Sequence, residues 1–168
     1  LVQVRYDDGQ IAYNLSVYNY NGLNQKIKRT DADLPDIKYY YSANSQVLEE
    51  RRLSDDVLLQ NYVWGTQYID DLVLRNLSSK QYMVHDTNFN VITRLDSSGA
   101  IVYRHVYDAF GTPKQVSSDW STFSSITEEL HLFTGRPHHP VHIQYDYRNR
   151  FQYYGYGRFL QSDPIGNW

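Results

Sequence analysis

The sequence predicts an all-β fold of repeated antiparallel hairpins, and three observations lead to that expectation. A tyrosine or histidine marks a turn every 21 to 23 residues between positions 20 and 107. Short segments with alternating apolar residues flank these turns, which is the pattern of half-buried strands. Tyrosine, which suits the face of a half-buried strand, occurs 17 times, whereas methionine occurs once.

The turn markers are spaced by 21, 21, 23 and 22 residues. Most are followed closely by Asn, Asp, Ser or Gly, which are suited to tight turns and tolerate positive φ. A unit of this length cannot bury its own apolar face, so we expect neighbouring units to stack on one another. The markers are Tyr20, Tyr41, Tyr62, His85 and Tyr107.

The predicted elements follow from the segments around these turns. The dipeptide Asn21-Gly22 is a strong hairpin signal, and Pro35 places a loop between two repeats. One short helix is predicted over Ser124–Leu132, where Thr127 and two glutamates could fill a first turn. The predicted strands are residues 14–20, 26–29, 38–41, 46–50, 82–84, 91–95 and 100–107.

Composition excludes several classes of protein. The apolar runs are far shorter than the ~20 residues of a membrane-spanning helix. A net charge of −3 argues against nucleic acid as the main partner. The absence of cysteine excludes disulfides and thiolate metal sites. No nucleotide-binding glycine motif, zinc-protease motif or Ser-His-Asp order is present, so we expect no cofactor.

The pattern changes along the chain and predicts three parts. Residues 1–116 are predicted hairpin repeats, and residues 117–132 are a polar connector. Residues 133–168 are dense in aromatic residues, Arg and Gly. The first residue is Leu1 and its segment already alternates like a strand, so we expect the sequence to lie within a longer natural polypeptide.

Four motifs between residues 107 and 166 resemble the Rhs, or YD-repeat, proteins where the repeats meet the Rhs-associated core. Those proteins carry Tyr-Asp-x-Phe-Gly, Phe-Thr-Gly-Arg, a Tyr-x-Tyr-Arg-x-Arg stretch and Gly-Arg-Phe before Asp-Pro-Ile-Gly. Here the motifs stand in the same order at Tyr107–Gly111, Phe133–Arg136, Tyr145–Phe151 and Gly157–Gly166. Residues 62–71 also resemble a segment of the family, so the resemblance covers essentially the whole chain.

The resemblance implies a curved β-shell, in which a spiralling strip of hairpins encloses a hollow and the associated core closes one end. In bacterial toxin systems such a shell encloses a toxic C-terminal segment, and in animal relatives it is an extracellular adhesion scaffold. The resemblance therefore implies an extracellular or cell-surface location.

Self-cleavage is a known property of the resembled core, and Arg150 and Asp163 match positions of its motif. However, Phe151 stands where self-cleaving members can carry Asp, and the sequence has one Asp-Pro-x-Gly motif instead of two. Aspartyl chemistry needs two carboxylates with separated protonation states. We therefore predict that the chain does not cleave itself, and Arg150 and Asp163 are candidates only for a vestigial site.

Other candidate residues have simpler structural explanations. His138, His139 and His142 have metal-ligand spacing, but Pro137 and Pro140 oppose a helix there, so no metal site is predicted. Arg136, Arg148, Arg150 and Arg158 are expected to pair with Asp146 and Asp163 or to stack on tyrosines. The pairs Asp55-Asp56 and Asp70-Asp71 are expected to be solvated.

These observations lead to three hypotheses of function. The leading hypothesis is a non-enzymatic shell or scaffold segment, whose partners are the rest of a longer polypeptide or a chain that covers exposed strand edges. The alternative is an extracellular module that binds a glycan or a partner protein, with Trp64, Trp120 and Trp168 as candidate sugar-stacking residues. The third hypothesis is an autoproteolytic core.

Overall fold

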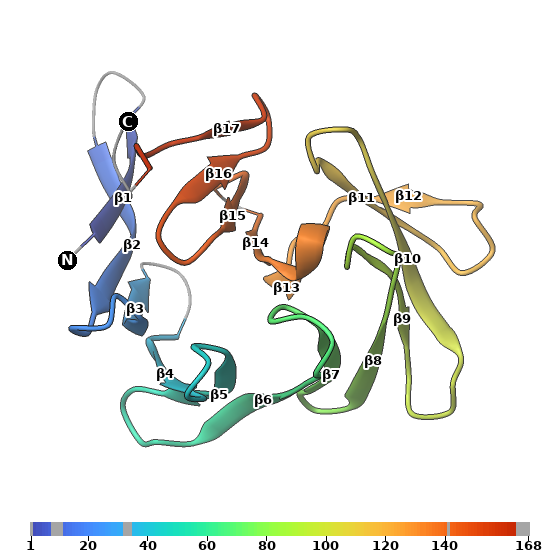
Figure 1. Ribbon diagram of the computed structural model, residues 1–168, viewed down its shortest axis with the longest axis horizontal. Coiled ribbons are helices and arrows are strands. Elements are labelled where there is room, and N and C mark those ends of the chain that lie inside the picture. Colours follow the sequence, from blue (N-terminus) through green and yellow to red (C-terminus); the bar gives the residue numbers. More distant parts are fainter. Residues whose placement is uncertain (1, 8–11, 32–34, 141, 164–168) are drawn as a thin grey trace. The chain divides into compact units, whose positions relative to one another are not determined.

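The structure, a computed structural model, describes residues 2–7, 12–31, 35–140 and 142–163. The described residues are mainly antiparallel strands, so the predicted all-β class is confirmed (Figure 1). The chain divides into two compact units, Leu1–Tyr62 and Val63–Trp168.

In the first unit, consecutive strands pair antiparallel in chain order. The core side chains are Tyr18, Ile37, Tyr39 and Tyr62, which alternate along their strands as half-buried faces require. The last two residues of the sixth strand belong to the second unit. The strands are β1 (Val2–Asp7), β2 (Ala12–Tyr20), β3 (Lys26–Asp31), β4 (Ile37–Tyr41), β5 (Val47–Arg52) and β6 (Leu58–Trp64).

The second unit contains further hairpins and a separate five-stranded sheet. The hairpin strands are β7 (Leu72–Asn76), β8 (Lys80–His85), β9 (Val91–Leu95), β10 (Ile101–Tyr107), β11 (Pro113–Val116) and β12 (Phe123–Ser124). The five-stranded sheet consists of β13 (Leu130–His131), β14 (Pro137–His139), β15 (Gln144–Asp146), β16 (Phe151–Tyr153) and β17 (Arg158–Phe159), with the 3-10 turn η1 (Phe133–Gly135) after β13.

One turn geometry recurs at the hairpins and explains the repeat. In the turn after β8, Asp86 donates its N–H to the carbonyl of Asn90 (3.0 Å) and accepts from the N–H of Phe89 (3.1 Å). Its Oδ1 also accepts from the N–H groups of Asn88 (2.8 Å) and Asn90 (3.0 Å). The side chain therefore satisfies backbone donors that a short loop leaves open. The same arrangement begins at Asn21, Ser42, Asp96 and Asp108.

The fourth residue of each such turn has a left-handed backbone. In the first of these turns that residue is Asn24, with φ 59°, so Asn21-Gly22 does not form a two-residue loop. The other fourth residues are Ser45, Phe89, Gly99 and Gly111, with φ between 59° and 88°.

Tyrosine hydroxyls connect one hairpin to the previous one. In the first unit, Tyr41 Oη donates to the carbonyl of Lys26 (2.7 Å), and in the second, Tyr107 Oη donates to the carbonyl of Val91 (2.6 Å). Lys26 directly follows the turn at residues 21–25, and Val91 directly follows the turn at residues 86–90. Burial raises the pKa of Tyr107, so its hydroxyl remains a donor. At Tyr41 and Tyr107, the tyrosine period thus coincides with a contact between neighbouring hairpins.

Two sequence-based expectations about elements are wrong. Tyr62 does not open a turn, because it lies inside β6 and its hydroxyl donates to Glu50 Oε1 (2.7 Å) across the sheet. The turn runs from Gly65 to Asp71, and the N–H of Gly65 donates to the carbonyl of Asp71 (2.7 Å). Trp64 therefore occupies the marker position, 23 residues after Tyr41.

The helix predicted over Ser124–Leu132 is also wrong, because β12 and β13 occupy its two ends. A nine-residue helix has little stability of its own. Here Glu128 instead binds Arg75 and Arg94, each at 2.7 Å, and these tertiary ion pairs decide the conformation. Within the described parts of the chain, no helix is long and apolar enough to cross a membrane.

The turn geometry predicts that Asp86→Ala destabilises the chain. Two backbone donors would lose their acceptor, and at about 1 kcal/mol each the free energy of unfolding should fall by about 1–2 kcal/mol. Asp86→Asn keeps Oδ1 but loses the hydrogen bond that Oδ2 accepts from Asn90 Nδ2 (2.7 Å), so it should lose less stability than Asp86→Ala. Urea denaturation of the three proteins measures this, and equal losses in both variants would contradict the capping role.

Candidate functional site

A buried carboxylate lies at the end of the turn between β6 and β7. Asp70 is 3% exposed, and its carbonyl accepts from the N–H of Leu72 (3.0 Å). The turn closes tightly at Gly65, where an added Cβ would lie 1.9 Å from Asp71 Oδ2. The absence of a side chain at Gly65 therefore lets this turn place Asp70 in the interior of the second unit.

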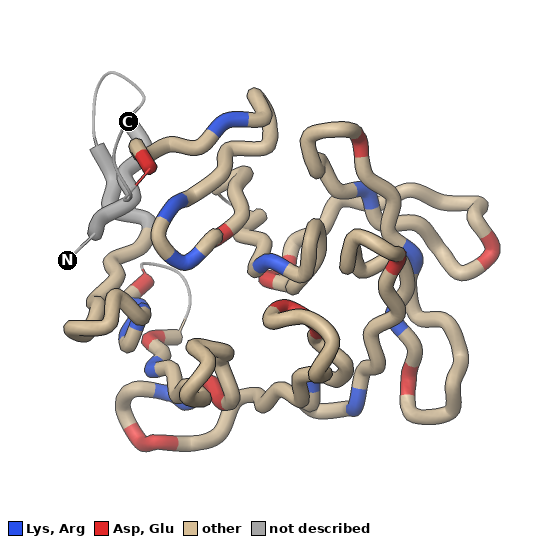
Figure 2. The backbone as a smooth tube through the Cα atoms, in the orientation of Figure 1, with Lys and Arg blue, Asp and Glu red and all other residues tan. Residues whose placement is uncertain are grey.

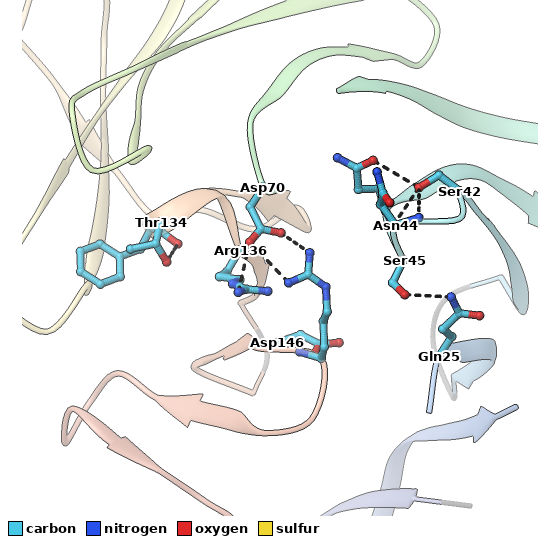
Figure 3. A network of polar contacts seen from close by, with 11 residues as sticks. Gln25, Ser42, Asn44, Ser45, Asp70, Thr134, Arg136 and Asp146 are labelled. Carbon is cyan, nitrogen blue, oxygen red and sulfur yellow. Dashed lines mark hydrogen bonds and ion pairs between the residues drawn. The ribbon is translucent and has the colours of Figure 1, made fainter. Parts of the chain in front are cut away.

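Two arginines of the second unit bind this carboxylate (Figure 3). Arg136 Nη2 lies 3.1 Å from Asp70 Oδ2, and Arg148 Nη2 lies 2.5 Å from Oδ1. Arg136 also stacks on the ring of Tyr147, 4.8 Å from its centroid. Since a buried charge is costly without a partner, the two guanidinium groups stabilise a position that a lone carboxylate could not hold.

The segment Phe133–Arg136 approaches the same turn by its backbone. Gly135 has φ +70°, and a Cβ there would lie 2.1 Å from the carbonyl oxygen of Asp70. Only glycine fits both the conformation and the close approach. The resemblance motif Phe-Thr-Gly-Arg thus has a physical basis, in which Gly135 gives access to the turn and Arg136 binds its carboxylate.

The five-stranded sheet contacts two further repeat turns. The N–H of Thr134 donates to Asn90 Oδ1 (2.8 Å) in the turn after β8. Tyr145 Oη donates to the carbonyl of Gly111 (2.8 Å) in the turn after β10. We call these contacts, together with the Asp70–Arg136–Arg148 group, the latch. The latch joins the five-stranded sheet, with η1 and the loop before β16, to the turns at residues 65–71, 86–90 and 108–112 of the second unit.

A second polar cluster of the second unit surrounds the buried side chain of Arg94. The Arg94 side chain is 1% exposed, and its Nη2 donates to Gln115 Oε1 (2.9 Å) while its Nη1 binds Glu128. Burial opposes ionisation of Glu128, but hydrogen bonds and charges from Arg75 and Arg94 hold its pKa below the usual value. The segment before β13, which contains Glu128, is therefore held by ion pairs to Arg75 in β7 and Arg94 in β9.

Of the three histidines with metal-ligand spacing, His138 and His139 are buried. His138 Nε2 lies 3.0 Å from Tyr154 Oη, and its ring stacks on the Tyr154 ring. His139 Nδ1 lies 2.8 Å from Glu129 Oε1, and the rings of His139 and His142 are 6.4 Å apart. Among the described residues, no group of three or more His, Asp or Glu side chains is arranged to hold a metal ion.

The structure brings Arg150 and Asp163 together. Arg150 Nη1 lies 2.8 Å from Asp163 Oδ2, and its guanidinium carbon lies 3.9 Å from the centroid of the Phe159 ring. Both side chains are partly exposed. The remainder of the Asp-Pro-Ile-Gly motif and Trp168 lie outside the described residues.

Sequence reasoning missed the central residue of the latch. Asp70 was expected to be solvated together with Asp71, and its burial shows that this expectation is wrong. The arginines were expected to pair with Asp146 and Asp163 or to stack on tyrosines. Arg150 does pair with Asp163 and Arg136 does stack on Tyr147. The binding of Asp70 by Arg136 and Arg148 was not expected. The available signal was the resemblance of residues 62–71 to a family segment, which marks this turn as more than a solvated loop.

Charges of both signs are dispersed along the strands and turns of each unit (Figure 2). This distribution, with the net charge of −3, differs from the basic face of a nucleic-acid-binding protein. Among the buried charges, Asp70, Arg75 and Arg94 form ion pairs within the second unit.

No protein-family model matches the sequence, and no curated protein matches it. Among solved structures, a mutant Tc holotoxin pore of Photorhabdus luminescens resembles 97% of this chain, with a TM-score of 0.61 and 17% identity. A TcdB2–TccC3–TEV structure resembles 98% of it, with a TM-score of 0.61 and 15% identity. TcdB2–TccC3 without its hypervariable C-terminal region resembles 97%, with a TM-score of 0.58 and 15% identity.

This chain spans 8% of each of those chains. At such identities the likeness concerns the fold, and it confirms the predicted Rhs-type β-shell fold class.

The latch predicts that Asp70→Asn is strongly destabilising. The change leaves two arginines without their carboxylate, and breaking a buried ion pair costs about 3–5 kcal/mol. Asp71→Asn is the control, because Asp71 lies 3.8 Å from His85 Nδ1 in a much weaker contact. Its expected loss is below about 1 kcal/mol. Equal denaturation midpoints for the two variants would refute the assignment.

The buried His138 predicts a loss of stability in acid. Burial is the main cause that lowers the pKa of His138 to about 4, whereas an unfolded histidine titrates near 6.5. Between these values the unfolded chain binds a proton that the folded chain does not. The free energy of unfolding therefore falls as the pH decreases from about 6.5 to about 4, by up to about 3 kcal/mol.

The measurement is urea denaturation across this pH range for wild type and His138→Phe, which keeps an aromatic ring. The variant should show a shallower pH slope. Another histidine, His105, remains in both proteins, and burial lowers its pKa to about 3. Identical slopes in the two proteins would show that His138 does not contribute.

Proposed function

We propose that this chain is a wall segment of a Rhs-type β-shell in a longer polypeptide, where it encloses or displays a cargo such as a C-terminal toxin. The observation that carries the proposal is the latch, in which the region of the five-stranded sheet binds three turns of the hairpin strands. Such contacts turn separate hairpins into a continuous wall with a terminating sheet. The segment is therefore structural and non-enzymatic.

The chemistry of the buried side chains supports a structural role. Asp70 binds Arg136 and Arg148, and Arg94 binds Glu128, through short ion pairs and hydrogen bonds. Arg150 and Asp163, the candidates for a vestigial cleavage site, form an ion pair beside the Phe159 ring. Their role in this proposal is to hold the segment that follows β17 against the sheet.

Membership in the Rhs, or YD-repeat, proteins is part of the proposal. It is supported by the four ordered motifs and by the fold shared with Tc toxin chains of which this chain spans 8%. In this proposal, residues 1–116 are the hairpin repeats, 117–132 the connector and 133–168 the start of the associated core. The partners are the adjoining parts of the longer polypeptide, and the location is extracellular or at the cell surface.

The test begins with the native polypeptide that contains this sequence. Its intact mass by top-down mass spectrometry should greatly exceed the 19.8 kDa of this chain. Limited proteolysis of that polypeptide should leave an enclosed segment uncut, and Asp70→Asn should expose it at least tenfold faster, while Asp71→Asn should not. A mature product of 19.8 kDa, or equal protection in both variants, would overturn the proposal.

The non-enzymatic part of the proposal has a separate test. The chain should remain intact during prolonged incubation, and Asp163→Asn should give the same fragment pattern as wild type in intact-mass spectra. Fragments that form from wild type and are absent from Asp163→Asn would establish autoproteolysis instead.

A further inference from the structure

The hairpin between β11 and β12 presents an exposed tryptophan in a left-handed backbone conformation. Trp120 has φ +65° and is 55% exposed. Its N–H donates to the carbonyl of Ser117 (3.1 Å), so it holds the same place as the fourth residue of the repeat turns, in a turn one residue longer. A bulky residue with this φ costs conformational free energy that Asn or Gly would avoid.

Packing compensates this cost at Phe89, in the turn after β8, but not at Trp120. Phe89 also has a positive φ, and its ring packs against Tyr68 at 4.6 Å and His85 at 6.2 Å. By contrast, the ring contact found for Trp120 within the described part of the chain is the Arg104 guanidinium at 4.9 Å. More than half of the Trp120 surface remains in water, so packing does not explain why an indole stands at this position.

A fixed polar rim lies next to the indole in the turn. Asp119 Oδ1 accepts from Ser117 Oγ (2.6 Å), from Ser121 Oγ (2.8 Å) and from the N–H of Ser121 (3.1 Å). These hydrogen bonds, with Ser117 first, lower the pKa of Asp119 to about 2, so the carboxylate is an ionised acceptor at neutral pH. Ser117 Oγ also accepts from the N–H of Thr122 (3.0 Å).

The guanidinium group of Arg104 stacks on the Trp120 indole and orients it. Arg104 Nε donates to the carbonyl of Ser118 (3.1 Å), which ties the guanidinium to the backbone of the same turn. Its stacking on the indole holds the ring in place. The hairpin therefore carries a preorganised aromatic platform with hydroxyl and carboxylate groups beside it, and Phe123 adds a second exposed ring.

We propose that this hairpin binds a neutral saccharide, with Trp120 as the stacking platform and the Asp119 group as the hydrogen-bonding rim. One face of a pyranose ring carries C–H groups that pack on the electron-rich face of an indole. The hydroxyls of such a sugar can donate to the Asp119 carboxylate and exchange hydrogen bonds with the neighbouring serines. This binding site goes beyond the structural role proposed above and does not depend on it.

Other partners fit this surface less well. A stable protein interface needs roughly 1,000 Å² of buried surface, more than the tip of one short hairpin offers. A nucleic acid would bring its phosphates next to the ionised Asp119 on a chain of net charge −3. A neutral sugar makes use of both the ring and the carboxylate.

The test measures binding of cellohexaose, chitohexaose and maltohexaose to the full chain by saturation-transfer NMR and calorimetry up to 10 mM. At least one of these oligosaccharides should bind with a dissociation constant of roughly 1 mM, as expected for a single stacking platform. Trp120→Asn should weaken that binding at least tenfold. Because asparagine tolerates the left-handed conformation, the variant should have an equal or higher melting temperature.

The matched control is Phe89→Asn, which makes the same type of change at the equivalent turn position. It should lower the melting temperature, because Phe89 packs against Tyr68, and it should leave saccharide binding within twofold of wild type. The proposal is overturned if none of the three oligosaccharides binds the wild-type chain, or if Trp120→Asn binds as tightly as wild type.

Discussion

The need to neutralise a buried carboxylate at Asp70 organises the second unit. Removing an ion from water is so costly that the carboxylate is stable there only with its charge partners in place. Arg136 and Arg148 supply them from two segments of the five-stranded sheet region. Their positions in turn require the tight approach of Gly135 to the Asp70 backbone. One charge thereby connects a repeat turn, a 3-10 turn and the loop before β16.

The repeat itself depends on a smaller and more tolerant interaction. Asn21, Ser42 and Asp86 differ in size and charge, but each places a side-chain oxygen where it accepts two backbone N–H groups. The turn geometry therefore persists although its residues vary. The tyrosine before the turn adds a hydroxyl bond to the previous hairpin, as Tyr41 and Tyr107 do. Local turn chemistry and contact between neighbouring hairpins act together in each unit.

The fourth position of the turn shows how one backbone conformation serves different purposes. Glycine at Gly99 and Gly111 adopts it without a steric penalty. At Phe89 the same conformation directs a ring into contact with Tyr68, so the strain is offset by packing. At Trp120 the ring points to solvent and is supported by Arg104. A wall built from such turns can carry a binding group at its surface without a change in its hydrogen bonds.

The sequence by itself determined the all-β class, the hairpin turns and the special character of the last third. These features follow from local chemistry, because turn residues, strand alternation and the tyrosine period act over a few neighbouring residues. Tertiary structure alone decided three other features: the burial of Asp70, the non-helical course of Ser124–Leu132 and the place of Tyr62 inside β6. Each depends on a partner distant in sequence: Arg136 and Arg148 for Asp70, Arg75 and Arg94 for Glu128, and Glu50 for Tyr62. Local propensity carries no information about such partners, and ion pairs and strand pairing outweigh it once the chain has folded.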